Sequence, residues 1–266
     1  GKGEMRCPVC DNHDWHPVPL HSKSKLQACK RCGFLCHEVS PDQEAKVRDF
    51  YRKDYKPVLG IAALTTATNK LQYIHNFLSE HLRDKKGLVC GDIGAATGYV
   101  LNYLLRRGHR VVGSEWTLAN RRLCEHLYGI PLAEELPENQ AYDLLVMYHV
   151  LEHLIEPDQK LSKYAGLLSP EGRFFVSTPK WLGLLQEESG NPLRDKGKPT
   201  PQDSFDNLYH VNHINLFSTR SLLNLFNKCG MTVMKQDWQC YGQTYLLRRG
   251  EVKPIEPEDW QVVEMT

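Results

Sequence analysis

A glycine-containing loop between an apolar run and an amphipathic segment constrains the fold of this chain more than any other feature. Residues 88–93 are apolar and rich in β-formers, the loop 94–98 (Gly-Ala-Ala-Thr-Gly) follows, and apolar residues recur at helical spacing over 100–105. A strand–loop–helix unit of this kind lets a ligand approach the strand end and the helix N-terminus. The segment therefore predicts the first unit of an α/β domain with a ligand site at the strand end.

The rest of the chain repeats this alternation. Further strands are predicted at 110–114, 142–148 and 172–177, and a last hairpin at 232–237 and 244–248. Strands that alternate with amphipathic helices favour a parallel sheet. We therefore expect an α/β, Rossmann-like domain with a mostly parallel sheet.

Glu115 ends the second predicted strand and lies 21 residues after Gly94. A carboxylate about 20 residues beyond such a loop commonly binds the ribose hydroxyls of a cofactor. Dinucleotide binding is the alternative, but the chain lacks a Gly-x-Gly-x-x-Gly pattern. The loop and Glu115 together favour an adenosine-containing cofactor.

Two Cys-x-x-Cys pairs near the start of the chain have zinc-ribbon spacing. Cys7 and Cys10 form the first pair, and Cys29 and Cys32 follow after 18 intervening residues. Each pair places two thiolates on one turn, and two pairs complete a tetrahedron around zinc. Gly33 supplies a residue that tolerates positive φ after the second pair. We therefore predict a structural zinc ion in a small N-terminal zinc-ribbon-like module.

The segment between the two pairs is short and polar, so we expect metal binding, and not a core of its own, to fold this module. A redox-active dithiol is the alternative, although a thioredoxin-type site needs only one pair. Other potential ligands nearby are His13, His16, Cys36 and His37, and Cys36 is a candidate to replace one of the paired cysteines.

Four segments are expected along the chain. They are the zinc-binding module at 1–40, a helical connector that covers the cofactor at 41–86, the catalytic domain at 87–250 and a C-terminal tail at 251–266. Within the connector, helices are predicted at 41–56 and 65–83.

Six motifs, in order over about residues 87–236, resemble the class I S-adenosylmethionine-dependent methyltransferases, and more narrowly their type 11/23 subfamily. They are 92–99 (Asp-Ile-Gly-Ala-Ala-Thr-Gly-Tyr), 112–115 (Val-Gly-Ser-Glu), 142–145 (Tyr-Asp-Leu-Leu), 149–154 (His-Val-Leu-Glu-His-Leu), 167–172 with 177–179, and 213–218 (His-Ile-Asn-Leu-Phe-Ser). Ala96 stands where many members carry glycine, and Lys180 where asparagine is common. The resemblance implies S-adenosyl-L-methionine as the cofactor.

The resemblance also implies where that cofactor binds. The glycine loop would line its methionine end, Glu115 would bind the ribose, and the residues after Glu115 would flank the adenine, with Glu134 or Glu135 at its edge. The expected cofactor-binding residues are Asp92, Gly94, Ala95, Gly98, Tyr99, Glu115, Trp116, Glu135, Leu136 and Tyr148. For Trp116 and Leu136, plain core packing is the alternative.

Two histidine clusters carry the catalytic candidates, which are His149, Glu152, His153, His210 and His213. A hydroxyl or acidic-carbon acceptor must lose a proton, and histidine accepts one near neutral pH. We expect His149 or His213, ahead of His153, to be this base. A divalent metal held by the histidines, and turn-stabilising hydrogen bonds from Glu152 and His153, are alternatives. His-x-x-Glu-His also matches an inverted zincin motif, but it follows a strand, which argues against a protease.

Residues 181–209 are rich in Gly, Pro, Asn, Asp and Lys, and a segment of this length predicts a lid or binding loop over the acceptor, with a mobile insert as the alternative. The 33 basic and 32 acidic side chains leave a formal charge of +1, so nothing indicates a general attraction to nucleic acid. No apolar run approaches the roughly 18 residues of a membrane span, and no signal-peptide pattern is present. We expect a cytoplasmic enzyme without a membrane partner.

The predicted function is methyl transfer to a small molecule: a sugar, a glycan-pathway intermediate or a natural-product precursor. Sugar C-methyltransferases resemble this chain in joining a four-cysteine zinc module to such a domain. A ribosomal RNA base methyltransferase with a zinc recognition module is the first alternative; the absence of Asn-Pro-Pro-Tyr and of a basic, aromatic-interleaved stretch opposes it. A non-catalytic, cofactor-binding interaction protein is the second.

Overall fold

The computed structural model describes residues 5–18, 26–38, 42–54, 61–179, 213–239 and 242–254. The chain forms two compact units, each assembled from stretches that are separate in sequence. We call Gly1–Glu44, His149–Gly166 and Val176–Thr266 the cysteine unit, and Ala45–Tyr148 with Leu167–Phe175 the glycine-loop unit. The four segments expected from sequence are each continuous stretches of chain, unlike these two units. Their functional boundaries stay a prediction.

A mostly parallel sheet forms the glycine-loop unit, with the strand order β8–β7–β4–β5–β6. β4 pairs in parallel with both β5 and β7, and β5 pairs in parallel with β6. The strands are β4 (Val89–Ile93), β5 (Arg110–Ser114), β6 (Leu132–Ala133), β7 (Tyr142–Tyr148) and β8 (Leu168–Pro179), of which Leu168–Phe175 belongs to this unit. β4 and β7 are almost fully buried, which explains their apolar sequences.

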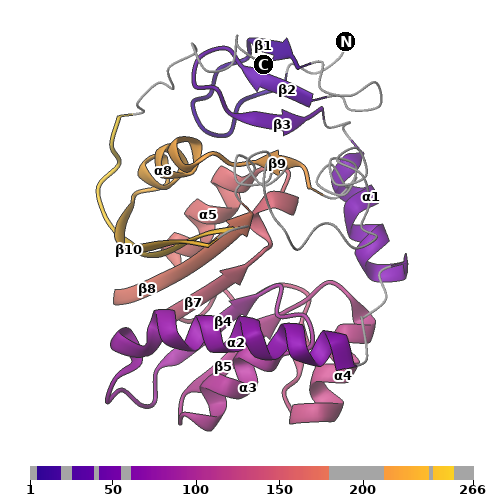
Figure 1. Cartoon of the computed structure of the whole chain (residues 1–266), viewed down its shortest axis with the longest axis vertical. Coiled ribbons are helices and arrows are strands. Elements are labelled where there is room, and N and C mark those ends of the chain that lie inside the picture. Colours follow the sequence, from indigo (N-terminus) through magenta and orange to yellow (C-terminus); the bar gives the residue numbers. More distant parts are fainter. Residues whose placement is uncertain are drawn as a thin grey trace, which may run out of the picture. The chain divides into compact units, whose positions relative to one another are not determined.

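Helices connect and cover these strands. α3 (Tyr99–Arg106) packs on β4 and β5, α2 (Ile61–Leu82) packs on α3, and α4 (Leu118–Tyr128) packs on β6 (Figure 1). α1 (Gln43–Asp49) and a π-helical turn (Phe50–Asp54) precede α2. The described part of the connector is therefore helical, as predicted, and within it the first predicted helix changes from α-helical to π-helical at Phe50.

Gly113 of β5 shows how closely helix and strand approach in this unit. A Cβ at this position would lie 2.4 Å from Cδ1 of Leu101 and 2.6 Å from Cδ2 of Leu132. Glycine is therefore required for α3 to pack on the sheet.

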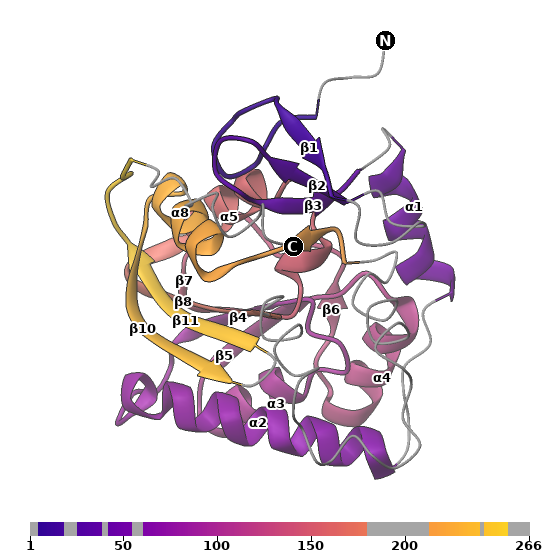
Figure 2. The same cartoon turned by 45° about the horizontal axis from the view of Figure 1, so that its top comes forward.

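A small antiparallel sheet forms the start of the cysteine unit, in the order β1–β2–β3–β9 (Figure 2). Its strands are β1 (Trp15–Pro17), β2 (Leu26–Cys29), β3 (Leu35–His37) and β9 (Asn215–Leu216). Leu26, Ala28, Leu35 and Leu216 form a buried cluster on it. The core of this module is therefore not formed by the N-terminal segment alone, because β9 supplies Leu216 from far along the chain.

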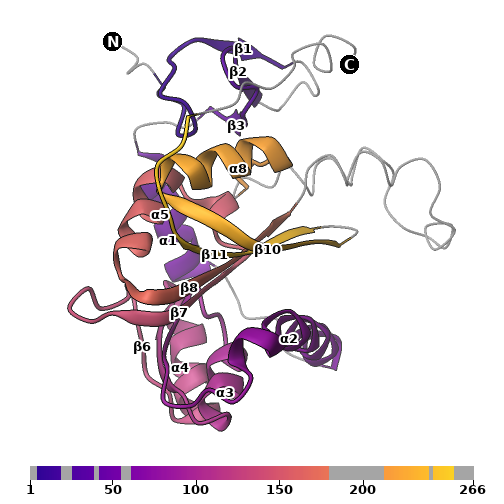
Figure 3. The same ribbon diagram turned by 90° about the vertical axis from the view of Figure 1, so that its left-hand side faces the viewer.

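The rest of the cysteine unit comprises η2 (Leu151–His153), α5 (Pro157–Gly166), the end of β8, α8 (Thr219–Lys228) and the antiparallel hairpin of β10 (Met231–Gln239) and β11 (Gly242–Arg249). α8 packs on β10 (Figure 3). Ser218 caps α8 by accepting the backbone N–H of Ser221 at 3.0 Å. β10 and β11 confirm the predicted hairpin.

An ion-pair network ties the first cysteine pair to α5 and α8. Asp158 accepts hydrogen bonds from Arg6 at 2.8 and 3.1 Å and from Nζ of Lys228 at 2.9 Å. Lys228 also donates to the carbonyl of Pro8 and to Asp11, both at 2.8 Å. Asp158 is only 7% exposed, so these charges stabilise the attachment more than surface pairs would.

No helix within the described residues is long and apolar enough to span a membrane.

Candidate functional site

The loop after β4 turns through the left-handed backbone region. φ is +69° at Gly94, +48° at Ala96 and +80° at Gly98. A Cβ on Gly98 would lie 2.1 Å from Sγ of Cys124, so conformation and space both require glycine there. Ala96 holds this conformation with a side chain, at a cost of about 1–2 kcal/mol.

Glu115 closes the loop from the end of β5. Its Oε2 accepts the N–H of Ala96 at 2.9 Å, and its Oε1 accepts the N–H of Thr117 at 2.8 Å. The N–H of Ala95 donates to the carbonyl of Ser114 at 2.9 Å. A carboxylate oxygen accepts about two hydrogen bonds, so Glu115 has capacity for ribose hydroxyls besides its role in the loop.

Asp92 lies one residue before the end of β4 and is buried. Burial, and then the charge of Glu115, raise the pKa of Asp92 well above its ordinary value. A nearby cation would favour the ionised carboxylate. Burial also raises the pKa of Tyr99 at the start of α3, with a further contribution from Asp92. Ala95 is buried with Leu101.

Trp116 lies in a contact group of its own. Its Nε1 donates to Oε1 of Glu135 at 3.3 Å, and the guanidinium of Arg48 lies 4.8 Å from its ring centroid. The ring of Tyr51 approaches edge-on, with centroids 6.3 Å apart, and Arg48 pairs with Glu135 at 3.4 Å. Residues from α1 and the π-helical turn therefore cover the predicted adenine-flanking residues.

Glu134, next to Glu135, also pairs with the π-helical turn. It pairs with Arg52 at 2.6 Å and with Arg121 at 3.3 Å. The hydrogen bond from Arg52 lowers the pKa of Glu134. Leu136 is buried, which agrees with either an adenine contact or core packing.

Tyr148, at the end of β7, is the last predicted cofactor residue. Its ring stacks on that of Phe175, with centroids 6.4 Å apart and an interplanar angle of 11°. Nζ of Lys70 lies 5.4 Å from the centroid of the Tyr148 ring.

The cysteine unit brings most of the predicted catalytic residues into one cluster. Oε1 of Glu152 lies 3.8 Å from Nε2 of His153 and 3.9 Å from Nδ1 of His149. The rings of His153 and His213 have centroids 4.8 Å apart. His149 adopts a φ of +54° directly after β7. His210 and the loop 181–209 lie outside the described residues.

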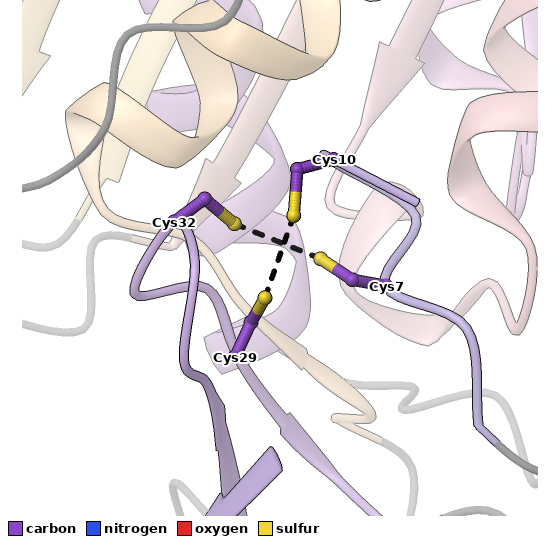
Figure 4. A group of neighbouring side chains, drawn as sticks. All are labelled: Cys7, Cys10, Cys29 and Cys32. Atoms are coloured by element: carbon purple, nitrogen blue, oxygen red, sulfur yellow. Dashed lines mark hydrogen bonds between the residues drawn. The ribbon is translucent and has the colours of Figure 1, made fainter. Parts of the chain in front are cut away.

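The four paired cysteines converge. Sγ of Cys7 lies 3.6 Å from Sγ of Cys32, and Sγ of Cys10 lies 3.4 Å from Sγ of Cys29 (Figure 4). All four sulfurs lie within 4.8 Å of one another. Four thiolates bound to zinc at about 2.3 Å would be about 3.8 Å apart, so the arrangement suits this ion. Cys36 is buried on β3 and is not a member of this group.

The sequence pattern did not identify Arg48, Thr178 or Asn215. Arg48 covers Trp116, Thr178 donates to Oε2 of Glu152 at 3.2 Å, and Asn215 donates to the carbonyls of Leu151 and Leu154. Each acts on a partner far away in sequence, so no local pattern reveals it.

Comparison with known proteins decides the family. The methyltransferase-domain family matches residues 65–236. The chain belongs to this family. It is 27% identical to the C-methyltransferase NovU of Streptomyces niveus over 86% of this chain and 56% of NovU. It is 29% identical to a ubiquinone biosynthesis O-methyltransferase of Bradyrhizobium diazoefficiens over 35% of this chain and 40% of that protein. The chain thus spans about half the length of these curated relatives.

Solved structures agree on the fold. Magnesium protoporphyrin IX methyltransferase of Synechocystis, with bound S-adenosylhomocysteine, superposes with a TM-score of 0.56 at 16% identity, over 78% of this chain and all of that one. The 1,6-didemethyltoxoflavin-N1-methyltransferase of Burkholderia thailandensis gives 0.55 at 16% identity, over 89% of this chain and all of that one. The α/β, Rossmann-like methyltransferase fold predicted from sequence is confirmed.

Proposed function

We propose that this protein transfers the methyl group of S-adenosyl-L-methionine to a small-molecule acceptor. The observation that carries the proposal is the left-handed loop from Gly94 to Gly98, fixed by Glu115, in a chain of the methyltransferase-domain family. The sulfonium already activates the methyl carbon, so the protein's tasks are to orient the reactants and exclude water.

The cofactor site is assigned as expected from sequence. The loop residues Gly94, Ala95 and Gly98 lie against the methionine end, with Tyr99 following. Asp92 faces a cationic part of the cofactor, because its burial makes the ionised form costly unless a positive charge is near. Glu115 accepts ribose hydroxyls.

The adenine lies beside Trp116, Glu135 and Leu136. The contacts of Arg48 and Tyr51 support this assignment. Both side chains pack against the ring of Trp116, and Arg48 also pairs with Glu135. Tyr148 is the last residue of β7 on the cofactor side.

The acceptor atom is carbon or oxygen. The two curated relatives are named as a C-methyltransferase and an O-methyltransferase. Both acceptor types must lose a proton, so we assign the base to His149 or His213 ahead of His153, with Glu152 orienting the histidines. A sugar, a glycan-pathway intermediate or a natural-product precursor fits this chemistry. A cytoplasmic location stays a prediction.

The cysteine cluster holds a structural zinc ion. Four protein sulfurs fill all positions of a tetrahedral ion, which leaves none for a substrate. Cys7, Cys10, Cys29 and Cys32 are its ligands.

The experiment measures S-adenosylhomocysteine release on a panel of sugar nucleotides, phenols and acidic-carbon compounds. One acceptor class should give turnover, and replacing the catalytic base by alanine should reduce its rate by about 10²–10⁴ with near-normal melting and cofactor affinity. His149→Ala, His153→Ala, His210→Ala and His213→Ala are compared in parallel. If all four keep full turnover, general-base catalysis by these histidines is excluded; if no acceptor of any of these classes is methylated, the small-molecule assignment is wrong.

A further inference from the structure

The cysteine unit contains a second group of metal-ligating side chains, different in chemistry from the four cysteines. Glu152 and His153 come from η2, and His213 comes from the segment just before β9. One ligand atom from each lies within 4.8 Å of the other two. Two imidazole nitrogens and one carboxylate oxygen therefore meet in one place.

Backbone hydrogen bonds fix the two segments that carry these side chains. The N–H of Ile214 donates to the carbonyl of Glu152 at 2.8 Å. The side-chain amide of Asn215 donates to the carbonyls of Leu151 and Leu154 at 3.1 and 2.5 Å. The residues on both sides of the ligands are thus held together, so bringing the ligands onto an ion requires side-chain rotation and little backbone movement.

The carboxylate of Glu152 is oriented toward the imidazoles. The residue is 2% exposed, and its Oε2 accepts a hydrogen bond from Thr178 at 3.2 Å. Its Oε1 lies 3.8 Å from Nε2 of His153. A metal ion on Oε1 would place a positive charge beside this buried carboxylate, which favours its ionised form. Thr178 fills the usual role of a hydrogen bond to a ligating carboxylate.

We propose that Glu152, His153 and His213 bind a divalent first-row transition metal ion, such as Fe²⁺, Co²⁺ or Zn²⁺, with at least one position open for an exogenous ligand. Two imidazoles and one carboxylate are the ligand set that such ions take in open sites. Metal–ligand bonds of about 2.0–2.2 Å place the donor atoms roughly 3–3.5 Å apart, so the donor separations of up to 4.8 Å must shorten by roughly 1–2 Å.

The role of this ion rests on the proposed function. An oxygen of the acceptor would bind at the open position of the metal ion. The metal would then lower the pKa of the bound hydroxyl, or of the C–H group next to a bound carbonyl. Of the clustered histidines that the structure describes, His149 is the one that is not a proposed ligand of this ion. His149 is held beside Glu152 at 3.9 Å.

The test titrates Co²⁺ alone into the full chain, after weakly bound metal has been removed with a chelator too weak to strip the cysteines. Calorimetry should detect one Co²⁺ site. The visible spectrum of the bound cobalt should indicate nitrogen and oxygen ligands, without thiolate charge-transfer bands. His213→Ala and His153→Ala should each lose this site. Thr178→Val should weaken it by about 10–100-fold, as expected for removal of a hydrogen bond to a ligand. His126→Ala, an exposed histidine on α4, is the matched control and should bind normally.

Metal content gives the second readout. Elemental analysis should find two metal ions per chain in Co²⁺-loaded protein and one in His213→Ala. Wild-type protein with metal at the cysteines alone, or His213→Ala with an unchanged second site, would overturn the proposal. If either ligand variant fails to fold, Glu152→Gln decides the question, because it removes only the charge. Cofactor affinity, measured without added Co²⁺, tests the methyltransferase function separately.

Discussion

The two units prepare for their ligands in different ways. In the cysteine unit, four thiols from two short turns face one another, and charged side chains tie the first turn to α5 and α8. In the glycine-loop unit, backbone conformation forms the site, and Glu115 fixes the loop through backbone N–H groups. The proposed zinc ion would neutralise the clustered thiolates of the first arrangement, whereas hydrogen bonds within the protein hold the loop of the second. Stability should therefore depend on the ligand in one unit and on glycine in the other.

Removing the zinc ligands should have the largest effect. A Cys7→Ser/Cys29→Ser variant should lose the proposed zinc ion, and zinc binding is worth about 10–16 kcal/mol in small zinc modules. Elemental analysis should show the loss, and hydrogen exchange should show that β1–β3 lose protection. S-adenosylmethionine should still bind, because none of its predicted ligands lies in the cysteine unit. If the variant lost cofactor binding together with the metal, the glycine-loop unit would depend on the cysteine unit, which would contradict the contrast drawn between them.

Asp158→Asn tests the charges that fasten the first cysteine turn. The change leaves Arg6 and Lys228 without their shared carboxylate and should cost about 3 kcal/mol, the low end for buried pairs because both cations are partly exposed. Burial alone would raise the pKa of Asp158, but hydrogen bonds from Arg6 and Lys228 outweigh it and lower the pKa below its ordinary value.

This lowered pKa also predicts a pH dependence. A carboxylate with a lowered pKa in the folded state stabilises the protein above the unfolded pKa, and the contribution is lost as pH falls through the folded value. The melting-temperature difference between wild type and Asp158→Asn should therefore be full at pH 7 and shrink below about pH 4. A constant difference down to pH 2 would show that the charge of Asp158 is not what stabilises the contact.

Gly98→Ala tests the glycine loop. The new Cβ would clash with Sγ of Cys124 in a backbone at φ +80°. The combined overpacking and strain should cost about 2–3 kcal/mol and weaken cofactor binding. Adding Cys124→Ala should recover the part due to the clash. Full recovery would mean that backbone conformation does not matter at Gly98.

Ala96→Gly should have the smallest effect, in the opposite direction. It relieves a left-handed alanine, at about 1–2 kcal/mol, but makes the unfolded chain more flexible by about 0.4–1 kcal/mol. Denaturant titration should show a net gain of about 0.5–1 kcal/mol. A destabilised variant would argue that the Ala96 methyl group makes a contact of its own.

Much of the fold was predictable because its signals are local. β4, β5 and β7 are apolar runs in a repeating pattern, and the Cys-x-x-Cys spacing predicted the four-sulfur group. Cys36, which the sequence left open as a replacement ligand, is not part of that group. Ala96 was marked as a departure from glycine, and its positive φ explains why glycine is common there.

What could not be predicted depends on residues that meet from distant parts of the chain. β9 pairs with β3, and Leu216 completes a core that the polar N-terminal segment did not suggest. Arg6 meets Asp158, and His153 meets His213, through the same long-range packing. The sequence identified both histidine clusters as catalytic candidates, but only the packing brings His213 beside Glu152 and His153.

Calorimetric titration of S-adenosylmethionine tests the central claim most directly. Wild-type protein should bind one equivalent with an affinity of about −8 kcal/mol, which corresponds to the micromolar range. Glu115→Ala should weaken binding by about 1.5–3 kcal/mol, the range for a hydrogen bond to a charged group, and Gly94→Leu should abolish it. Glu115→Gln, which keeps the acceptor oxygen, should lose less. Absence of binding in the wild type, or unchanged binding in both Glu115→Ala and Gly94→Leu, would contradict the account.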